Sequence, residues 1–262
     1  MPLCVFYNDK LFKVNIIFQV LWLAVSVDIV SAFATVNIHC QKLLHGGVKK
    51  IMKLIQAKEI TGGLSRTSKL ECGSFSLSAF DCVTGSKLAK IKGSVCNKCY
   101  ARKNSYLYPS VKTAQAKRIK NLNHPNWAGA MVSLIRIQAL ENDTNLFRWF
   151  DSGDLQKGML ARIVEVCKLT PEIRHWLPTH EAGMLTKDIE KLGGNLPDNL
   201  IIRLSASMID GKPPKSWSHT STVHKESTPV DFLCKAKEQG GKCLDCTACW
   251  NKDIKNISYM QH

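Results

Sequence analysis

The cysteines are the residues of this sequence best suited to chemistry. Cys96 and Cys99 are separated by two residues, and Cys243, Cys246 and Cys249 repeat that spacing near the C-terminus. Thiolates three positions apart can bind one metal centre from a single turn, and a triple at this spacing resembles the ferredoxin pattern that surrounds an iron–sulfur cluster. Zinc is the alternative, because two Cys-x-x-Cys pairs also form a common structural zinc site.

Other cysteines extend this pattern. Cys82 lies upstream of the first pair, and Cys72 and Cys234 are further candidate ligands. Cys167 falls on the apolar stripe of a predicted helix and is expected in the core. We expect sulfur atoms from these distant segments to converge on one shared metal centre. The predicted metal ligands are Cys82, Cys96, Cys99, Cys243, Cys246 and Cys249.

Composition favours a reducing compartment and a polyanionic partner. The chain has 11 cysteines, and their close pairing suits metal binding better than disulfides, so we expect a cytoplasmic protein. The 36 Lys and Arg residues outnumber the 21 Asp and Glu residues, which gives a net charge of +15. Such a chain can bind nucleic acid, although a basic balance can also serve only to solvate the surface.

The first 51 residues are expected to lie outside the fold. Residues 11–36 are largely apolar, which is typical of a signal peptide or a membrane anchor, but Lys13 and Asp28 interrupt the run. Residues 46–48, Gly-Gly-Val, can be encoded by a purine-rich ribosome-binding sequence that precedes Met52. We therefore expect translation to begin at Met52, and we expect no stable membrane association.

Alternating patterns after Met52 predict an α/β core domain over residues 52–210. Residues 52–108 are expected to form short strands and loops, and a basic helix begins with Ser110 as its N-cap. Predicted helices cover 110–122, 126–141, 157–169 and 186–192, and predicted strands cover 146–150, 174–177 and 199–204. This order indicates βαβ units and a parallel sheet. Residues 211–262 form a Cys-rich tail that is expected to pack on the core.

Polar residues follow each predicted strand. Because the carboxyl ends of parallel strands meet at one edge of a sheet, these residues are expected to share a site. The alternative is that the strands simply end in polar turns. The residues at the three strand ends are Asp151, Ser152, Gly153 and Asp154, then Thr179, His180 and Glu181, then Ser205 and Ser207.

Five motifs in order resemble the phage gene product 88 family. They are Cys96-x-x-Cys99-Tyr100-Ala101, the stretch Phe147–Leu155, Trp176–Thr179, Leu204–Ser207 and the final Cys243-x-x-Cys246-x-x-Cys249-Trp250. The resemblance runs from Met52 almost to the C-terminus and implies a protein of phages or mobile elements.

A more distant resemblance is to radical SAM enzymes, and it implies a partial parallel β/α barrel with a cysteine-rich C-terminal extension. By that resemblance Cys82, Cys96 and Cys99 would hold an iron–sulfur cluster with one open iron, to which S-adenosylmethionine binds. Asp154 would hold the methionyl amine. The catalytic candidates are Asp151, Asp154 and Thr179, and the cofactor-binding candidates are Ser152, Gly153 and Ser205.

Two functions remain open. The first is an iron–sulfur enzyme of the radical SAM type. The second is a non-catalytic protein, stabilised by zinc or a cluster, that contacts nucleic acid. Basic residues near the first cysteine pair fit either function, since they could offset cluster charge, bind phosphate or only solvate a loop. These basic residues are Lys87, Lys90, Lys92, Lys98, Arg102 and Lys103.

Overall fold

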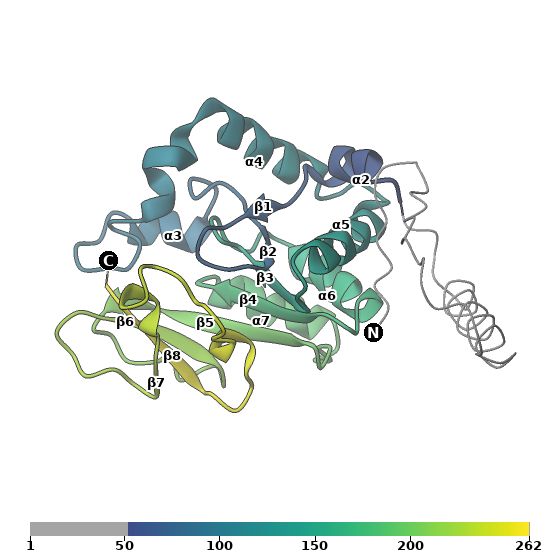
Figure 1. Ribbon diagram of the computed structural model, residues 1–262. Helices are drawn as coiled ribbons and strands as arrows, with labels where there is room; N and C mark the ends of the chain where they lie inside the picture. The colour runs from purple at the N-terminus through teal and green to yellow at the C-terminus, as the bar shows by residue number, and fades with distance from the viewer. Residues whose placement is uncertain (1–51, 262) are drawn as a thin grey trace, which may run out of the picture. The chain divides into compact units, whose positions relative to one another are not determined.

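An open, mostly parallel sheet of eight strands organises the protein, and the computed structural model describes residues 52–261 (Figure 1). In spatial order the strands are β1 (Ser65–Arg66), β2 (Gly73–Phe75), β3 (Leu146–Trp149), β4 (Arg174–Thr179), β5 (Leu200–Ile209), β6 (Thr220–His224), β8 (Asn256–Met260) and β7 (Phe232–Leu233). Only the pairing of β1 with β2 is antiparallel.

The sheet confirms the predicted α/β class but not a barrel. From β2 to β6, each strand lies beside the strand that precedes it in the sequence, so their carboxyl ends share one edge of the sheet. The short strands β1 and β7 form the two outer edges and do not pair with each other. The predicted partial β/α barrel of the radical SAM type is therefore not confirmed.

Helices pack on the sheet and supply its larger core. They are α2 (Leu54–Thr61), α3 (Val83–Leu88), α4 (Pro109–Asn121), α5 (Trp127–Glu141), α6 (Met159–Leu169) and α7 (Ala182–Lys191). Trp127 of α5 and Leu160 of α6 pack with Phe147 and Trp149 of β3, and all four are at most 1% exposed. Fully burying such a side chain contributes roughly 1.5–3 kcal/mol.

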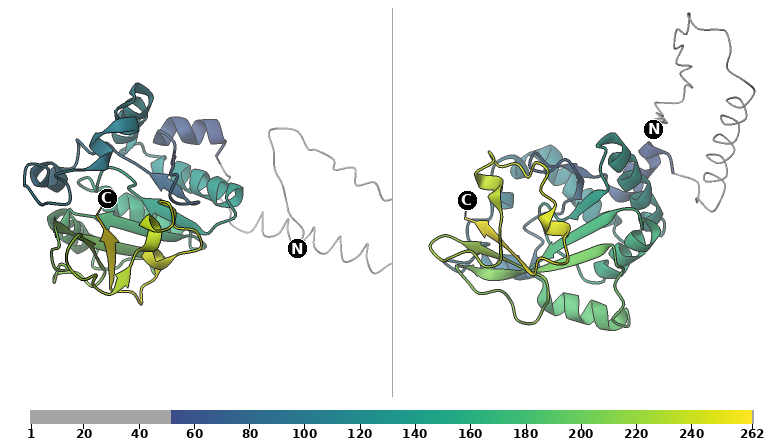
Figure 2. Two further views of the ribbon diagram at one scale, coloured as in Figure 1. Left: turned by 60° about the vertical axis from the view of Figure 1, so that its left-hand side comes forward. Right: turned by 60° about the horizontal axis from the view of Figure 1, so that its bottom comes forward.

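The C-terminal segment covers the opposite face of the sheet. Because side chains alternate along a strand, Leu146, Trp176 and Ile201 point away from the α5–α6 layer. They pack instead against Trp250, whose indole nitrogen donates to the Phe147 carbonyl at 3.0 Å. Trp250 lies in η4 (Ala248–Trp250), a short 3₁₀ helix that includes Cys249, the last cysteine of the C-terminal run. Figure 2 shows this segment beside the sheet from two further directions.

The tail also extends the sheet, which the sequence did not predict. β6, β7 and β8 all come from residues after 211, and β8 pairs with both of the others. Thr220–His224 contains mostly polar residues, and Asn256–Met260 interleaves Asn and Ser with Ile, Tyr and Met, so neither shows the continuous apolar run that marks a fully buried strand. Residues 52–261 form one compact unit.

The helix predictions from residue 109 onward are confirmed in type and approximate position. One detail is wrong, because α4 begins at Pro109 with Tyr108 as its N-cap residue, not at Ser110. Proline suits the first helical position, where its missing N–H has no intrahelical acceptor to lose. The predictions about residues 1–51 lie outside the described residues. No helix within 52–261 combines the length and hydrophobicity needed to cross a membrane.

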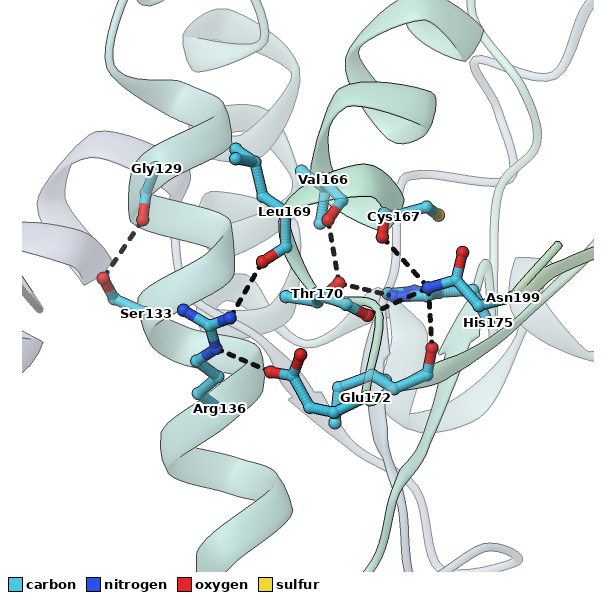
Figure 3. A network of polar contacts seen from close by, with 11 residues as sticks. Gly129, Ser133, Arg136, Val166, Cys167, Leu169, Thr170, Glu172, His175 and Asn199 are labelled. Atoms are coloured by element: carbon cyan, nitrogen blue, oxygen red, sulfur yellow. Dashed lines mark hydrogen bonds and ion pairs between the residues drawn. The ribbon is translucent and has the colours of Figure 1, made fainter. Parts of the chain in front are cut away.

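A buried polar network supports the end of the sheet remote from the candidate site (Figure 3). His175 of β4 is fully buried, and its Nε2 lies 2.8 Å from Thr170 Oγ1, which donates to the Val166 carbonyl. The side-chain amide of Asn199 donates to the carbonyls of Cys167, Thr170 and Ile173. These contacts fasten the end of α6 to the starts of β4 and β5, which is a structural role.

We expect His175→Phe to weaken the acid sensitivity of folding. Burial lowers the pKa of His175 from 6.5 to about 3. Between these values the unfolded chain binds a proton that the folded protein excludes. The free energy of unfolding therefore falls as pH drops from about 6.5 toward 3, by up to about 1.4 kcal/mol per pH unit. Urea titrations across this range should show a shallower dependence in the variant.

The variant must be compared with wild type, because the titration of Asp154 changes the free energy of unfolding with pH in the opposite direction. Burial raises the pKa of Asp154 to about 6, so its contribution to stability is present at low pH and is lost as pH rises toward 6. Asp154 is present in both proteins and cancels in the difference. Identical pH slopes for the two proteins would contradict the assignment to His175.

Candidate functional site

The structure separates the cysteines into two groups. The first group is Cys82, Cys96 and Cys99, where negative charge on Cys96 and Cys99 acts on Cys82. The second group is Cys72, Cys234, Cys243, Cys246 and Cys249, whose members act on one another in the same way. No cysteine of the second group is among the strongest charges acting on Cys82 or Cys96. The predicted ligands therefore belong to two places in the fold.

A glycine lies between two sulfurs of the first group. Cys82 is the residue before α3, and Gly85 lies in the first turn of that helix. A Cβ atom on Gly85 would lie 3.6 Å from the sulfurs of both Cys82 and Cys96, and 2.9 Å from the Cβ of Cys82. Both sulfurs therefore border the space that the missing side chain leaves.

The end of β5 holds the loop that carries Cys96. The Val95 amide donates to the Ser207 carbonyl, and the Ile209 amide donates to the Gly93 carbonyl, both at 3.0 Å. This short antiparallel pairing extends β5 beyond the part that pairs with β4. The Cys99 amide then donates to the Cys96 carbonyl at 3.2 Å, which places the two thiols on one turn.

A carboxylate from the end of β4 fixes the segment after Cys82. Glu181 is 2% exposed and accepts hydrogen bonds from the Thr84 amide at 2.7 Å and the Thr84 hydroxyl at 2.6 Å. The contact satisfies an amide that the start of α3 leaves without a helical acceptor. Glu181 belongs to the predicted strand-end residues, whereas its partner Thr84 was not predicted.

Asp154 is the strand-end carboxylate whose charge acts most strongly on Cys82 and Cys96. It is 5% exposed, and its charge raises the pKa values of Cys82 and Cys96. Its oxygens accept from Thr179 Oγ1 at 2.6 Å, the His180 amide at 2.9 Å and the Leu155 amide at 2.7 Å. Burial raises the pKa of Asp154 to about 6 despite these bonds. Asp154 and Thr179, both catalytic candidates, are thus joined directly.

Asp151 joins the end of β3 to the loop after Cys99. Its carboxylate accepts from Arg148 at 2.9 Å and from the Tyr106 hydroxyl at 2.6 Å, and its carbonyl accepts from Tyr100. Phe150, just before it, has a φ of +57°, which is uncommon for a bulky residue and turns the chain at the strand end. The geometry gives Asp151 a positioning contact with the cysteine loop.

The two cofactor-binding candidates after Asp151 hold the ends of β2 and β3 together. Ser152 donates to the Leu77 carbonyl at 2.8 Å and receives the Leu77 amide on its own carbonyl at 2.9 Å. Gly153 has a φ of +77°, and a Cβ there would lie 2.6 Å from that of Leu77. The third candidate, Ser205, accepts from the Ser221 hydroxyl at 3.0 Å between β5 and β6.

The second group lies where the tail covers the sheet. The Cys243 amide donates to the Lys69 carbonyl at 3.0 Å, and the Cys234 amide donates to the Ser258 carbonyl at 2.9 Å. Cys249 Sγ lies 3.4 Å from the Tyr259 hydroxyl on β8. Three separate segments thus bring these thiols together. Cys234 and Cys72 thus lie with the predicted triple of Cys243, Cys246 and Cys249. The spacing of the cysteines alone indicated these two additional members only weakly.

Two arginines, one fully buried and one largely buried, support the second group, and spacing gave no signal for either. Arg203 is fully buried on β5 and donates to the carbonyls of Cys249, Ile254, Ala248 and Asn251 at 2.7–3.3 Å. Arg148 lies over the Trp176 ring at 4.9 Å, and its side chain is 13% exposed. Its charge favours the thiolates of Cys72 and Cys243.

All the cysteines of both groups are free thiols. Burial raises the pKa of Cys72, Cys96 and Cys249 to about 12 each, and neighbouring thiolates add to the effect in all three. A bound metal would supply the positive charge that the thiolates lack. Within residues 52–261, no three His, Cys, Asp or Glu side chains are already arranged as a set of metal ligands.

Comparison with known proteins gives a family. The model of the family described as "Gene product 88" matches residues 49–252, most of the chain. No curated protein and no solved structure matches the sequence or the fold significantly.

Proposed function

The chain belongs to the gene product 88 family, and we propose that it is an iron–sulfur protein whose first cysteine group binds S-adenosylmethionine through a cluster. One observation carries the proposal. Three thiols from two turns gather beside a buried carboxylate at the carboxyl ends of parallel strands, where ligands bind in α/β folds.

The first group would supply three of the four ligands of a cluster and would leave one iron open. Cys82, Cys96 and Cys99 offer three thiolates, and the five cysteines of the second group act on one another instead. The space beside Gly85 lies next to two of the three sulfurs. A cubane cluster has four irons, so three thiolates leave one iron free for another ligand.

The surrounding residues would orient a cationic ligand. Cys82, Cys96 and Cys99 would hold the cluster, which in its reduced form would supply the electron needed to break a carbon–sulfur bond of the S-adenosylmethionine sulfonium. Asp154 is fixed by Thr179 and two backbone amides, so its carboxylate has one orientation. An ammonium group beside it would favour its ionised form and offset the charge of the thiolates. Glu181 keeps the Cys82 turn in place.

The test uses the full chain purified without oxygen. We expect a brown protein with broad absorption near 400 nm, which cleaves S-adenosylmethionine when reduced. A colourless protein with stoichiometric zinc would overturn the iron–sulfur proposal. A brown protein that cleaves no S-adenosylmethionine with several reductants would overturn the proposed reaction and leave the cluster in place.

Gly85→Ala should reduce the iron content at the first group. The added Cβ would lie 2.9 Å from that of Cys82 and would contact the sulfurs of Cys82 and Cys96. Alanine stabilises a helix by about 1 kcal/mol relative to glycine, so the change in helix propensity alone should not destabilise α3. Iron and sulfide assays on anaerobic protein measure the change.

Gly183→Ala is the matched control for that variant. Gly183 lies at the start of α7, also a helix, and a Cβ there would meet nothing within 4 Å. This variant should keep the iron content of the wild type. Equal iron in all three proteins would contradict the assigned role of the space beside Gly85.

A further inference from the structure

One long stretch of the chain carries basic charge with no acidic residue to offset it. Between Asp81 and Glu141 the sequence contains no Asp or Glu. The part from Phe80 to Asn121, which we name the basic segment, has Asp81 as its single acidic residue and includes the first cysteine group, α3 and α4. Its exposed lysines are Lys87, Lys90, Lys92, Lys98, Lys103, Lys112, Lys117 and Lys120.

These lysines have no partners within the part of the chain that the structure describes. None of the eight forms an ion pair with residues 52–261, and none donates a side-chain hydrogen bond there. The 3₁₀ helices η1 (Tyr100–Arg102) and η2 (Asn104–Leu107) contact each other, and η2 contacts α4. In Figure 1, α3 lies close to this assembly, so the charges share one region of the molecule.

Exposed aromatic rings gather in the same segment. Phe80, Tyr100 and Tyr108 are 55%, 52% and 61% exposed, and no other aromatic side chain within residues 52–261 is as exposed. The Arg102 guanidinium lies over the Phe80 ring, 5.0 Å from its centre. This contact holds one face of the ring, so the other face is available for stacking.

We propose that the basic segment binds a single-stranded polynucleotide. Lysines that lack acidic partners can neutralise successive phosphates, and exposed rings can stack on unpaired bases. The rings favour a single strand, because bases in a duplex already stack on one another. The inference depends on exposed side chains and their charges, so it does not rest on the cluster proposed above.

The first test removes phosphate contacts. Anisotropy of a fluorescein-labelled 20-nucleotide oligo(dT) or oligo(U) gives the affinity of the full chain between 50 and 200 mM salt. Single-strand binding changes by about 0.7 in the slope of log K against log salt for each phosphate neutralised. The triple variant K87Q/K90Q/K92Q should therefore lower the slope by about 2. The control K157Q/K187Q/K191Q removes three exposed lysines elsewhere and should keep the slope.

The second test removes a stacking ring. Tyr108→Ala should weaken binding roughly tenfold at fixed salt, within the range seen for loss of one stacked base. Leu140→Ala, which removes a side chain that is 81% exposed outside the segment, should leave affinity unchanged. All these side chains are exposed, so each variant should fold. A melting temperature equal to that of the wild type is the check.

Several results would overturn the proposal. One is an affinity for oligonucleotide that does not depend on salt, and another is an equal loss in the two triple variants. Tighter binding to a duplex of the same length would reject a single strand as the ligand. Polyglutamate of matched charge serves as a further competitor. If it binds as tightly as the oligonucleotide, the ligand is any acidic polymer, such as an acidic protein surface, and not a nucleic acid.

Discussion

Cys99→Ser should lower the rate of S-adenosylmethionine cleavage by at least about a thousandfold, a loss of more than 4 kcal/mol in transition-state stabilisation. The first group has only three thiols, Cys82, Cys96 and Cys99, so the loss of one leaves two that cannot hold a cubane cluster. The reduced protein would then lack the electron source for cleavage. The measurement is the rate of 5′-deoxyadenosine formation under strictly anaerobic conditions.

Cys167→Ala is the matched control, because it removes a thiol that belongs to neither group. Cys167 is fully buried in α6 among apolar side chains, and its replacement should cost about 1 kcal/mol of stability. The folded variant should cleave S-adenosylmethionine at the wild-type rate. A Cys99→Ser protein that keeps the wild-type rate would contradict the role assigned to the first group.

Arg203→Met should destabilise the fold by at least about 3 kcal/mol. Arg203 is fully buried, and its guanidinium donates to four carbonyls of the segment Ala248–Ile254. Methionine fills much of the volume but donates no hydrogen bond, so these carbonyls lose their donors. Urea denaturation monitored by tryptophan fluorescence gives the difference in the free energy of unfolding.

Arg136→Met tests whether the effect is specific to burial and bonding. The side chain of Arg136 is 30% exposed and pairs with Glu172 at 2.7 Å, and such a partly exposed pair contributes about 1 kcal/mol or less. Arg203→Met should also bind less metal at the second group, because Arg203 donates a hydrogen bond to the Cys249 carbonyl. Similar stability losses in the two variants would contradict the assigned role of Arg203.

Patterns in the sequence predicted the central part of the fold well. The period of apolar residues over 126–141 and 157–169 corresponds to α5 and α6, and the runs near 146 and 174 correspond to β3 and β4. These elements bury one continuous apolar stripe or run, which a sequence displays directly. The strands of the tail could not be predicted in this way, because β6 and β8 pair through polar residues such as Thr222 and Ser258.

The candidate site was predicted in part. Spacing indicated the cysteine pairs, and the polar strand ends indicated Asp154 and Glu181, whose charges act on Cys82, and Thr179, which donates to Asp154. Spacing did not show that the cysteines divide into two groups, since that depends on how the tail packs on the sheet. Contacts between residues distant in the sequence, such as Arg203 with Cys249, leave no local signal.

Iron and acid-labile sulfide per chain test the central claim most directly, when they are measured anaerobically on the wild type and two triple variants. If the two groups are separate sites, C82S/C96S/C99S and C243S/C246S/C249S should each keep the iron of the other group and lose their own. The account is contradicted if either triple variant loses all of its iron, as a single shared centre would require, or if the wild type contains none.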